Sequence, residues 1–151
     1  MRVIIQHDEW VLLLDPWPSG SLAFHGWVSH PQCFLNDKIL MSFMNQYANY
    51  SKQKIAILIS HGHDDHCDDN FLNSISKSMQ IFIPEYRKKG FQKRIKSCDF
   101  EYISEIPPNK AINFGPFSLS SFIVEEHSED DAIINIETEN YTFVHASDNS
   151  T

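Results

Sequence analysis

The sequence has few cysteines, and they form no pattern that suggests disulfide bonds. Cys33, Cys67 and Cys98 are widely spaced, odd in number and without a CxxC motif. Small secreted domains that depend on disulfides carry an even number of cysteines at close spacing. We therefore expect a cytoplasmic protein without a disulfide framework.

The chain also lacks long apolar runs and an excess of positive charge. Its first residues show no apolar stretch followed by a cleavage site, so we expect no signal peptide. No segment approaches the roughly 20 apolar residues of a transmembrane helix. Lys and Arg number 12 against 20 Asp and Glu, a formal net charge of −8. Because nucleic acids are bound by cationic surfaces, we expect no nucleic-acid partner.

The length and the order of predicted elements favour one α/β domain. The 151 residues are 42% hydrophobic and 21% charged, as in ordinary globular proteins. Strands open and close the chain, and strands alternate with helices between them. Asp68 or Asp69 is expected to cap the second helix, and residues 139–140 to form a tight turn. The predicted strands cover residues 3–6, 10–14, 55–60, 80–83, 100–103, 111–114, 117–126, 132–137 and 141–145, and the predicted helices 39–50, 68–79 and 85–97.

The strongest signal is a group of metal-binding residue types, His61-x-His63-x-Asp65-His66, directly after the buried strand 55–60. A strand end fixes the backbone, and a tight loop can aim several side chains into one space. Two histidines separated by one residue can bind one ion, and the Asp and His that follow can bind a second. Imidazole and carboxylate groups suit zinc, manganese and iron. A surface turn that is rich in His and Asp by chance is the weaker alternative.

This motif after a strand resembles the signature of the metallo-β-lactamase superfamily. Three other residues fit in chain order: Asp15 resembles the family's early Asp, His127 its next metal ligand and Asp148 its bridging Asp. Taken alone, Asp15 reads as a turn cap and His127 as an exposed loop histidine. The resemblance implies that His61, His63 and His127 bind one metal, that Asp65 and His66 bind the other, that Asp148 lies between the two, and that Asp15 supports the loop without touching a metal.

A finer resemblance concerns the segment Asp15-Pro16-Trp17 and the aromatic loop that follows it. These residues are similar to the branch that contains ascorbate-phosphate lactonases, N-acyl-phosphatidylethanolamine phospholipases and the CMP-sialic-acid hydroxylases. Ordinary packing of loop aromatics is the alternative. The loop residues concerned are Phe24, Gly26, Trp27 and Pro31.

The family fold is a four-layer αββα sandwich of two similar halves, and the second half supplies a final His ligand. This sequence stops at Thr151, directly after Asp148. We therefore expect residues 1–151 to be a metallo-β-lactamase-like domain that is truncated at the C-terminus, with the N-terminal half and the start of the second. An uncovered sheet face or edge would make the isolated chain poorly soluble or dependent on a partner.

The resemblance implies two divalent metal ions, with zinc as the first choice and manganese or iron as alternatives. Its implied activity is that of a metallo-hydrolase, in which a metal-bound hydroxide attacks an ester, lactone, amide or phosphodiester bond. Asp65 or Asp148 would accept or relay the proton. We expect a small-molecule or lipid-like substrate. The alternative is an iron-dependent oxygenase-type or an inactive metal-binding member of the same superfamily.

Three features are expected to lie outside this chemistry. Cys67 follows His66 directly, yet structural packing is its favoured role. His145 lies three residues before Asp148, and because residues at odd separation on a strand face opposite sides, we expect it to point away from the site. The basic stretch over residues 87–96 is expected to be a solvated helix face, with a patch that contacts phosphate or nucleic acid as the alternative.

Overall fold

The computed structural model describes residues 3–16, 21–22, 27–28, 54–64, 66–124 and 131–146. These residues form a five-stranded sheet, a four-stranded sheet, two helices and the small ribbon of β3 (Ser21–Leu22) and β4 (Trp27–Val28). The helix predicted over 39–50 lies outside the described residues. Among the helices that are described, none has the length and apolar character needed to cross a membrane.

The first sheet has the strand order β1-β2-β5-β6-β7. β1 pairs antiparallel with β2, while β2, β5, β6 and β7 are parallel neighbours. Because parallel strands end at the same edge of a sheet, the segments that follow β2, β5 and β6 meet there. The strands span Val3–His7 (β1), Trp10–Leu14 (β2), Ile55–Leu58 (β5), Gln80–Pro84 (β6) and Tyr102–Ile106 (β7).

The second sheet is antiparallel throughout, in the order β11-β10-β9-β8. Its strands alternate between buried and more exposed residues, as in a sheet with one face on the core. On the opposite face Phe122 and Val144 are 45% and 59% exposed. The strands span Ala111–Phe114 (β8), Phe117–Val124 (β9), Asp131–Glu137 (β10) and Thr142–His145 (β11).

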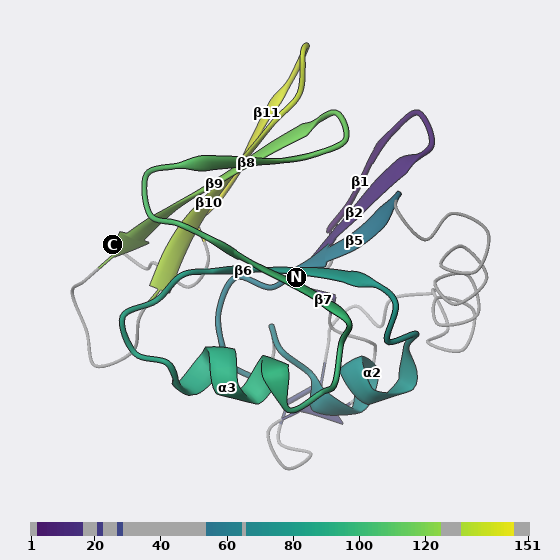
Figure 1. Cartoon of the computed structure of the whole chain (residues 1–151), viewed down its shortest axis with the longest axis vertical. Helices are drawn as coiled ribbons and strands as arrows, with labels where there is room; N and C mark the ends of the chain where they lie inside the picture. Colours follow the sequence, from purple (N-terminus) through teal and green to yellow (C-terminus); the bar gives the residue numbers. More distant parts are fainter. Residues whose placement is uncertain are drawn as a thin grey trace.

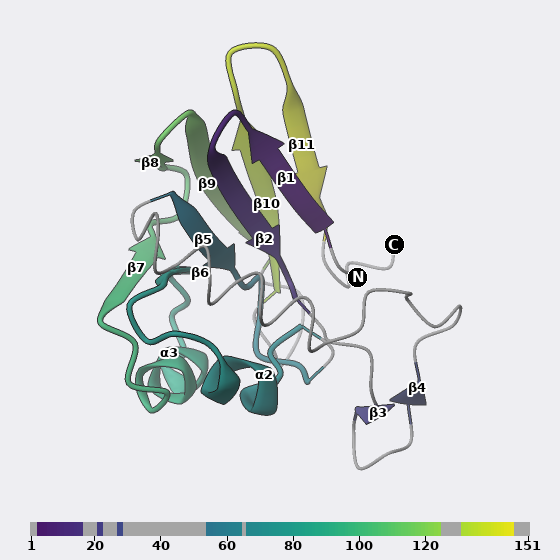
Figure 2. The same cartoon turned by 90° about the vertical axis from the view of Figure 1, so that its right-hand side faces the viewer.

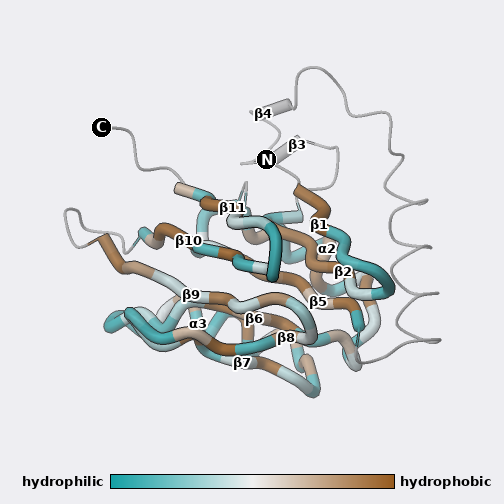
Figure 3. The backbone as a smooth tube through the Cα atoms, turned by 90° about the horizontal axis from the view of Figure 1, so that it is seen from above, coloured by the Kyte–Doolittle hydropathy of each residue, from teal (hydrophilic) through white to brown (hydrophobic). Residues whose placement is uncertain are grey.

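The described elements stack as helices, first sheet and second sheet, with a core between each pair of layers (Figure 1, Figure 2). Alternate residues of β2 serve the two cores: Leu13 faces the helices α2 (Asp69–Ser74) and α3 (Gly90–Lys96), whereas Leu12 faces the second sheet. Hydropathy follows the same layers. In Figure 3, β5 is mostly hydrophobic and α3 mostly hydrophilic, as expected for a strand between two layers and a helix that covers the sheet from outside. This is an α/β fold, as the element order predicts.

The helix α2 begins where the sequence predicts but ends five residues early. The Asp68 side chain caps it by accepting hydrogen bonds from the amides of Asn70 and Phe71. The predicted end at residue 79 is wrong, because Ile75 is extended and buries its side chain in the core. The Lys77 ammonium then donates to the Leu72 carbonyl, which the shortened helix leaves without a helical partner.

The helix predicted over 85–97 begins only at Gly90, because the preceding residues belong to the sheet edge. The Glu85 amide donates to the Ile106 carbonyl, which extends the pairing of β6 with β7. Tyr86 is buried and its hydroxyl donates to the Ser60 carbonyl. These two tertiary hydrogen bonds hold the chain extended where its local sequence favours a helix.

The other strands differ from their predicted bounds by small shifts. β8 matches its prediction, and the turn at residues 139–140 is confirmed by the bond from the Thr138 amide to the Tyr141 carbonyl. The strand predicted over 100–103 instead spans Tyr102–Ile106, since Phe100 is buried among the helices and the Glu101 amide donates to the Lys77 carbonyl.

Candidate metal centre

Three residues that follow neighbouring parallel strands form the base of the site. Asp15 follows β2, Ser60 lies two residues after β5 and Tyr86 two residues after β6. Ser60 is bonded from both sides: its carbonyl accepts from the Tyr86 hydroxyl, and its amide donates to Asp15 Oδ1 at 2.7 Å. The sheet therefore fixes the residue from which the histidine loop starts.

The Asp15 carboxylate is the hub of a buried polar network. Its Oδ2 accepts from the Ser60 hydroxyl at 2.7 Å and from His66 Nδ1 at 2.8 Å, and the residue is 0% exposed. Burial opposes its charged form, but His145, His66 and the Ser60 amide outweigh burial and hold the pKa of Asp15 well below its ordinary value. Asp15 is therefore an anion that orients the groups around it.

The rings of His61 and His63 place two nitrogens close together, as a shared metal ion requires. His61 Nε2 lies 2.8 Å from His63 Nδ1, with ring centroids 4.4 Å apart. The 2.8 Å separation is that of a hydrogen bond between the rings, and two nitrogens on a tetrahedral zinc ion lie roughly 3.3 Å apart, so the rings would separate by about half an ångström to bind an ion. The other ring nitrogen of His61, Nδ1, lies 3.0 Å from the Ser60 hydroxyl and 3.8 Å from Asp131 Oδ1. Metal-binding histidines commonly have such an oxygen partner on the second nitrogen.

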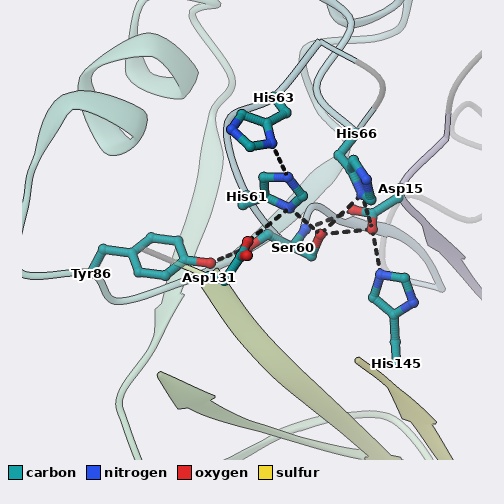
Figure 4. Close-up of polar contacts among 8 residues, drawn as sticks. All are labelled: Asp15, Ser60, His61, His63, His66, Tyr86, Asp131 and His145. Atoms are coloured by element: carbon teal, nitrogen blue, oxygen red, sulfur yellow. Dashed lines mark hydrogen bonds and ion pairs between the residues drawn. The ribbon is translucent and has the colours of Figure 1, made fainter. Parts of the chain in front are cut away.

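His66 joins the same cluster from the far end of the loop (Figure 4). Its ring centroid lies 4.1 Å from that of His61, and the residue is 5% exposed. Because Nδ1 is engaged by Asp15, Nε2 is the ring nitrogen that would bind an ion. The structure thus brings the three histidines together: His61 and His66 lie against Ser60, and His63 contacts His61. Asp65, His127 and Asp148 lie outside the described residues, so their roles stay predictions.

His145 also belongs to this cluster, contrary to the sequence prediction. Its Nε2 lies 2.8 Å from Asp15 Oδ2, although at an angle outside hydrogen-bond geometry. Asp15, His66 and His145 form a buried group whose ligand-type atoms all lie within 4.8 Å of one another. The prediction assumed a strand that continues past His145, but β11 ends at His145 and Ala146 lies outside it. The inward side of β11, which His145 occupies, was the signal available in the sequence.

Two groups of side chains could hold an ion, and the contacts that their nitrogen and oxygen atoms already make favour one of them. Asp15 Oδ2 already faces the Ser60 hydroxyl, His66 Nδ1 and His145 Nε2 at hydrogen-bond distances. Such an oxygen is suited to orient His66 rather than to bind metal itself. The donor set of His61 and His63, two imidazole nitrogens that converge, fits a divalent ion better.

Cys67 is a packing residue, as the sequence predicts. It is 0% exposed and lies in the core between the first sheet and the helices. Burial raises the pKa of its thiol to about 12, so the group is a neutral thiol within the core at neutral pH.

Comparison with known proteins gives the fold a name. No protein-family profile and no curated protein match the sequence. Solved structures do match: a possible metal-dependent hydrolase from Veillonella parvula has a TM-score of 0.66 at 18% identity and covers 95% of this chain and 58% of its own. The diiron β-hydroxylase CmlA from Streptomyces venezuelae has a TM-score of 0.66 at 14% identity, over 97% of this chain and 28% of its own.

A third match carries the fold name itself. The metallo-β-lactamase fold protein YhfI from Bacillus subtilis has a TM-score of 0.62 at 16% identity, over 100% of this chain and 55% of its own. The chain therefore has the metallo-β-lactamase fold. It spans 58%, 28% and 55% of the lengths of these three structures.

Proposed function

We propose that this chain is part of a metal-dependent hydrolase of the metallo-β-lactamase superfamily. The observation that carries the proposal is the approach of His61 Nε2 to His63 Nδ1 at 2.8 Å, at the end of a buried parallel strand. The fold shared with a possible metal-dependent hydrolase supports it. We assign one divalent ion to His61, His63 and His127, and a second to Asp65 and His66, with Asp148 between the two.

In this proposal some residues bind the metal ions, and others orient the residues that bind them. A bound divalent ion supplies a hydroxide nucleophile at neutral pH and polarises the oxygen of the scissile bond. Asp15 holds His66 by its Nδ1, and Ser60 lies against Nδ1 of His61, so both rings present Nε2 to the site. Asp65 or Asp148 would take the proton that the reaction releases.

We propose an ester, lactone, amide or phosphodiester bond in a small or lipid-like substrate. The acidic composition of the chain, with a net charge of −8, favours neither nucleic acid nor another polyanion as partner. Zinc is the first choice of metal, with manganese as an alternative. The residues of the lactonase and phospholipase resemblance beyond Asp15 and Pro16 are Trp17, Phe24, Gly26, Trp27 and Pro31, and their side chains lie outside the described residues.

A second candidate is an iron-dependent oxygenase-type protein. The observation that favours it is the similarity in fold to a diiron β-hydroxylase at a TM-score of 0.66. Histidine and carboxylate ligands bind iron as well as zinc, so the donor set alone permits both functions. The two candidates differ in the metal that the purified protein retains.

Metal analysis of the purified protein and of His63→Ala tests the proposal. We expect the full-length wild-type protein to retain two zinc or manganese ions and to hydrolyse members of an ester, lactone and phosphodiester panel. His63→Ala should lose metal and activity, because one of the two converging nitrogens is gone. His7→Ala, on the distant strand β1, is the matched control and should behave as wild type.

Iron together with a redox-active spectrum would favour the oxygenase-type candidate. Equal metal contents in the wild-type protein and His63→Ala would refute both candidates.

A further inference from the structure

The side chain of Arg94 reaches from α3 to the loop that carries the histidines. Its Nη1 donates to the Gly62 carbonyl at 2.5 Å, and its Nη2 donates to the Cys67 carbonyl at 2.8 Å. Gly62 lies between His61 and His63, and Cys67 directly follows His66. One guanidinium group therefore joins the two ends of the loop. The sequence favours a solvated helix face here, and for Arg94 that prediction is wrong, because its guanidinium bonds the loop.

Two carboxylates complete the contacts of the same guanidinium. Arg94 Nε donates to Asp69 Oδ1 at 2.8 Å, and Nη2 lies 3.0 Å from Asp64 Oδ1. Burial works against its charged form, but Asp69 and Asp64 hold the pKa of Arg94 above its ordinary value. Arg94 is thus a cation whose charge is balanced by two adjacent anions. This balance weakens the repulsion that a cation would otherwise exert on a metal ion at the histidines.

The same face of α3 also packs directly on the loop. Phe91 lies three residues before Arg94, so both side chains project from one side of the helix. A Cβ atom added at Gly62 would lie 3.2 Å from Phe91 Cδ2, which is tighter than most Cβ contacts in proteins, so the Phe91 ring would have to shift slightly. Glycine at this position lets the loop approach the helix closely, and the Gly62 carbonyl is then within reach of Arg94.

We propose that Arg94 is a positioning residue of the metal centre, which holds the loop from Gly62 to Cys67 in the shape that lets its histidines bind metal. This inference rests on the proposed function, because it concerns the same site. A loop that is ordered before metal binds loses less conformational entropy on binding. Only arginine has the planar fork of donors that can serve two carbonyls and two carboxylates at once.

Zinc titration of Arg94 variants, with a chelator of known affinity as competitor, tests this role. We expect Arg94→Gln to bind zinc about 10- to 100-fold more weakly than wild type, as for other residues that orient metal ligands. Arg94→Lys keeps the charge and the apolar stem but not the fork, and should weaken binding by about tenfold. The absorption bands of the cobalt-loaded protein should also change in both variants, because they report ligand geometry rather than stability.

Lys93→Gln is the matched control, since it removes the same charge from an exposed position of the same helix. It should bind zinc and cobalt as wild type does, and circular dichroism verifies that each variant is folded. If Arg94→Gln does not fold, the zinc affinity and cobalt bands of Arg94→Lys alone test the role of Arg94. Wild-type zinc affinity and cobalt bands in the folded Arg94 variants, or equal weakening in Lys93→Gln, would overturn the role of Arg94.

Comparison with His63→Ala distinguishes a failure of the Arg94 proposal from a failure of the proposed function. If His63→Ala loses zinc while the Arg94 variants keep it, the metal site stands and Arg94 has no part in shaping it. If the wild-type protein binds zinc no better than His63→Ala, the proposed function falls, and the role of Arg94 falls with it.

Discussion

Replacing Asp15 with Asn removes the charge at the hub of the network beneath the histidines. The carboxylate accepts hydrogen bonds from the Ser60 amide, the Ser60 hydroxyl and His66 Nδ1, all within 2.8 Å. Asn keeps the shape of the side chain but replaces one accepting oxygen with an NH₂ group. In the place of Oδ2, that group would face the hydroxyl and the imidazole that now donate to Asp15.

The size of the effect follows from the burial of Asp15, which is 0% exposed. A hydrogen bond to a charged group contributes about 1.5–3 kcal/mol, and the loss of one partner of a buried charged pair costs about 3–5 kcal/mol. We expect Asp15→Asn to lower the free energy of unfolding by about 3–5 kcal/mol. Because His66 loses its orienting partner, zinc affinity should fall by about 10- to 100-fold.

The pH dependence of stability should change in the same variant. The pKa of Asp15 is lower in the folded than in the unfolded protein, so its contribution is fully present above the ordinary carboxyl value of 3.8. The contribution is lost as the pH falls below that value and through the folded-state pKa. The wild-type protein should therefore lose stability below about pH 4 more steeply than Asp15→Asn does.

Urea denaturation at pH 7 and across the acidic range, followed by circular dichroism, measures these effects. Asp8→Asn is the control, because it makes the same chemical change at a side chain that is 85% exposed, and it should leave stability and zinc affinity unchanged. Equal unfolding midpoints and equal zinc affinities for Asp15→Asn and wild type would refute the reasoning that the buried carboxylate organises the site.

Two further predictions concern groups around the loop. Tyr86→Phe leaves the Ser60 carbonyl without its tyrosine donor, so the free energy of unfolding in urea should fall by about 1–3 kcal/mol and zinc affinity by less than tenfold. Cys67 should resist disulfide reagents in the folded protein at pH 8, because a thiol with a pKa of about 12 is ionised there in about one molecule in 10,000. Mass spectrometry of labelled peptides with and without urea measures this protection, and equal labelling rates would contradict it.

Local patterns in the sequence predicted the parts of the fold that depend on neighbouring residues. The apolar run at residues 55–58 forms the buried strand β5, and Asp68 caps α2. In both cases the signal and the structure lie within a few residues of each other. Helix ends that depend on distant contacts were predicted wrongly, as at Ile75, which enters the core, and Tyr86, which bonds Ser60.

In the candidate site, too, the sequence indicated the residues of one short segment but not those that come from distant segments. The short motif predicted that His61, His63 and His66 would meet, because a loop of six residues can bring its own side chains together. The motif did not indicate His145, which comes from the second sheet, or Arg94, which comes from a later helix. Both lie far from the motif along the chain, so the inward face of β11 was the one local signal for His145, and Arg94 had none.

By itself, the amino-acid sequence determined the α/β class and the position of the histidine loop after a buried strand. Periodicity and spacing encode these properties, which act over a few residues. Only the tertiary structure decided that Asp15 would be a buried anion beneath the histidines and that Arg94 would join both ends of their loop. The physical reason is that burial and the hydrogen bonds of a charged group depend on which distant segments pack together, and packing is a property of the whole fold.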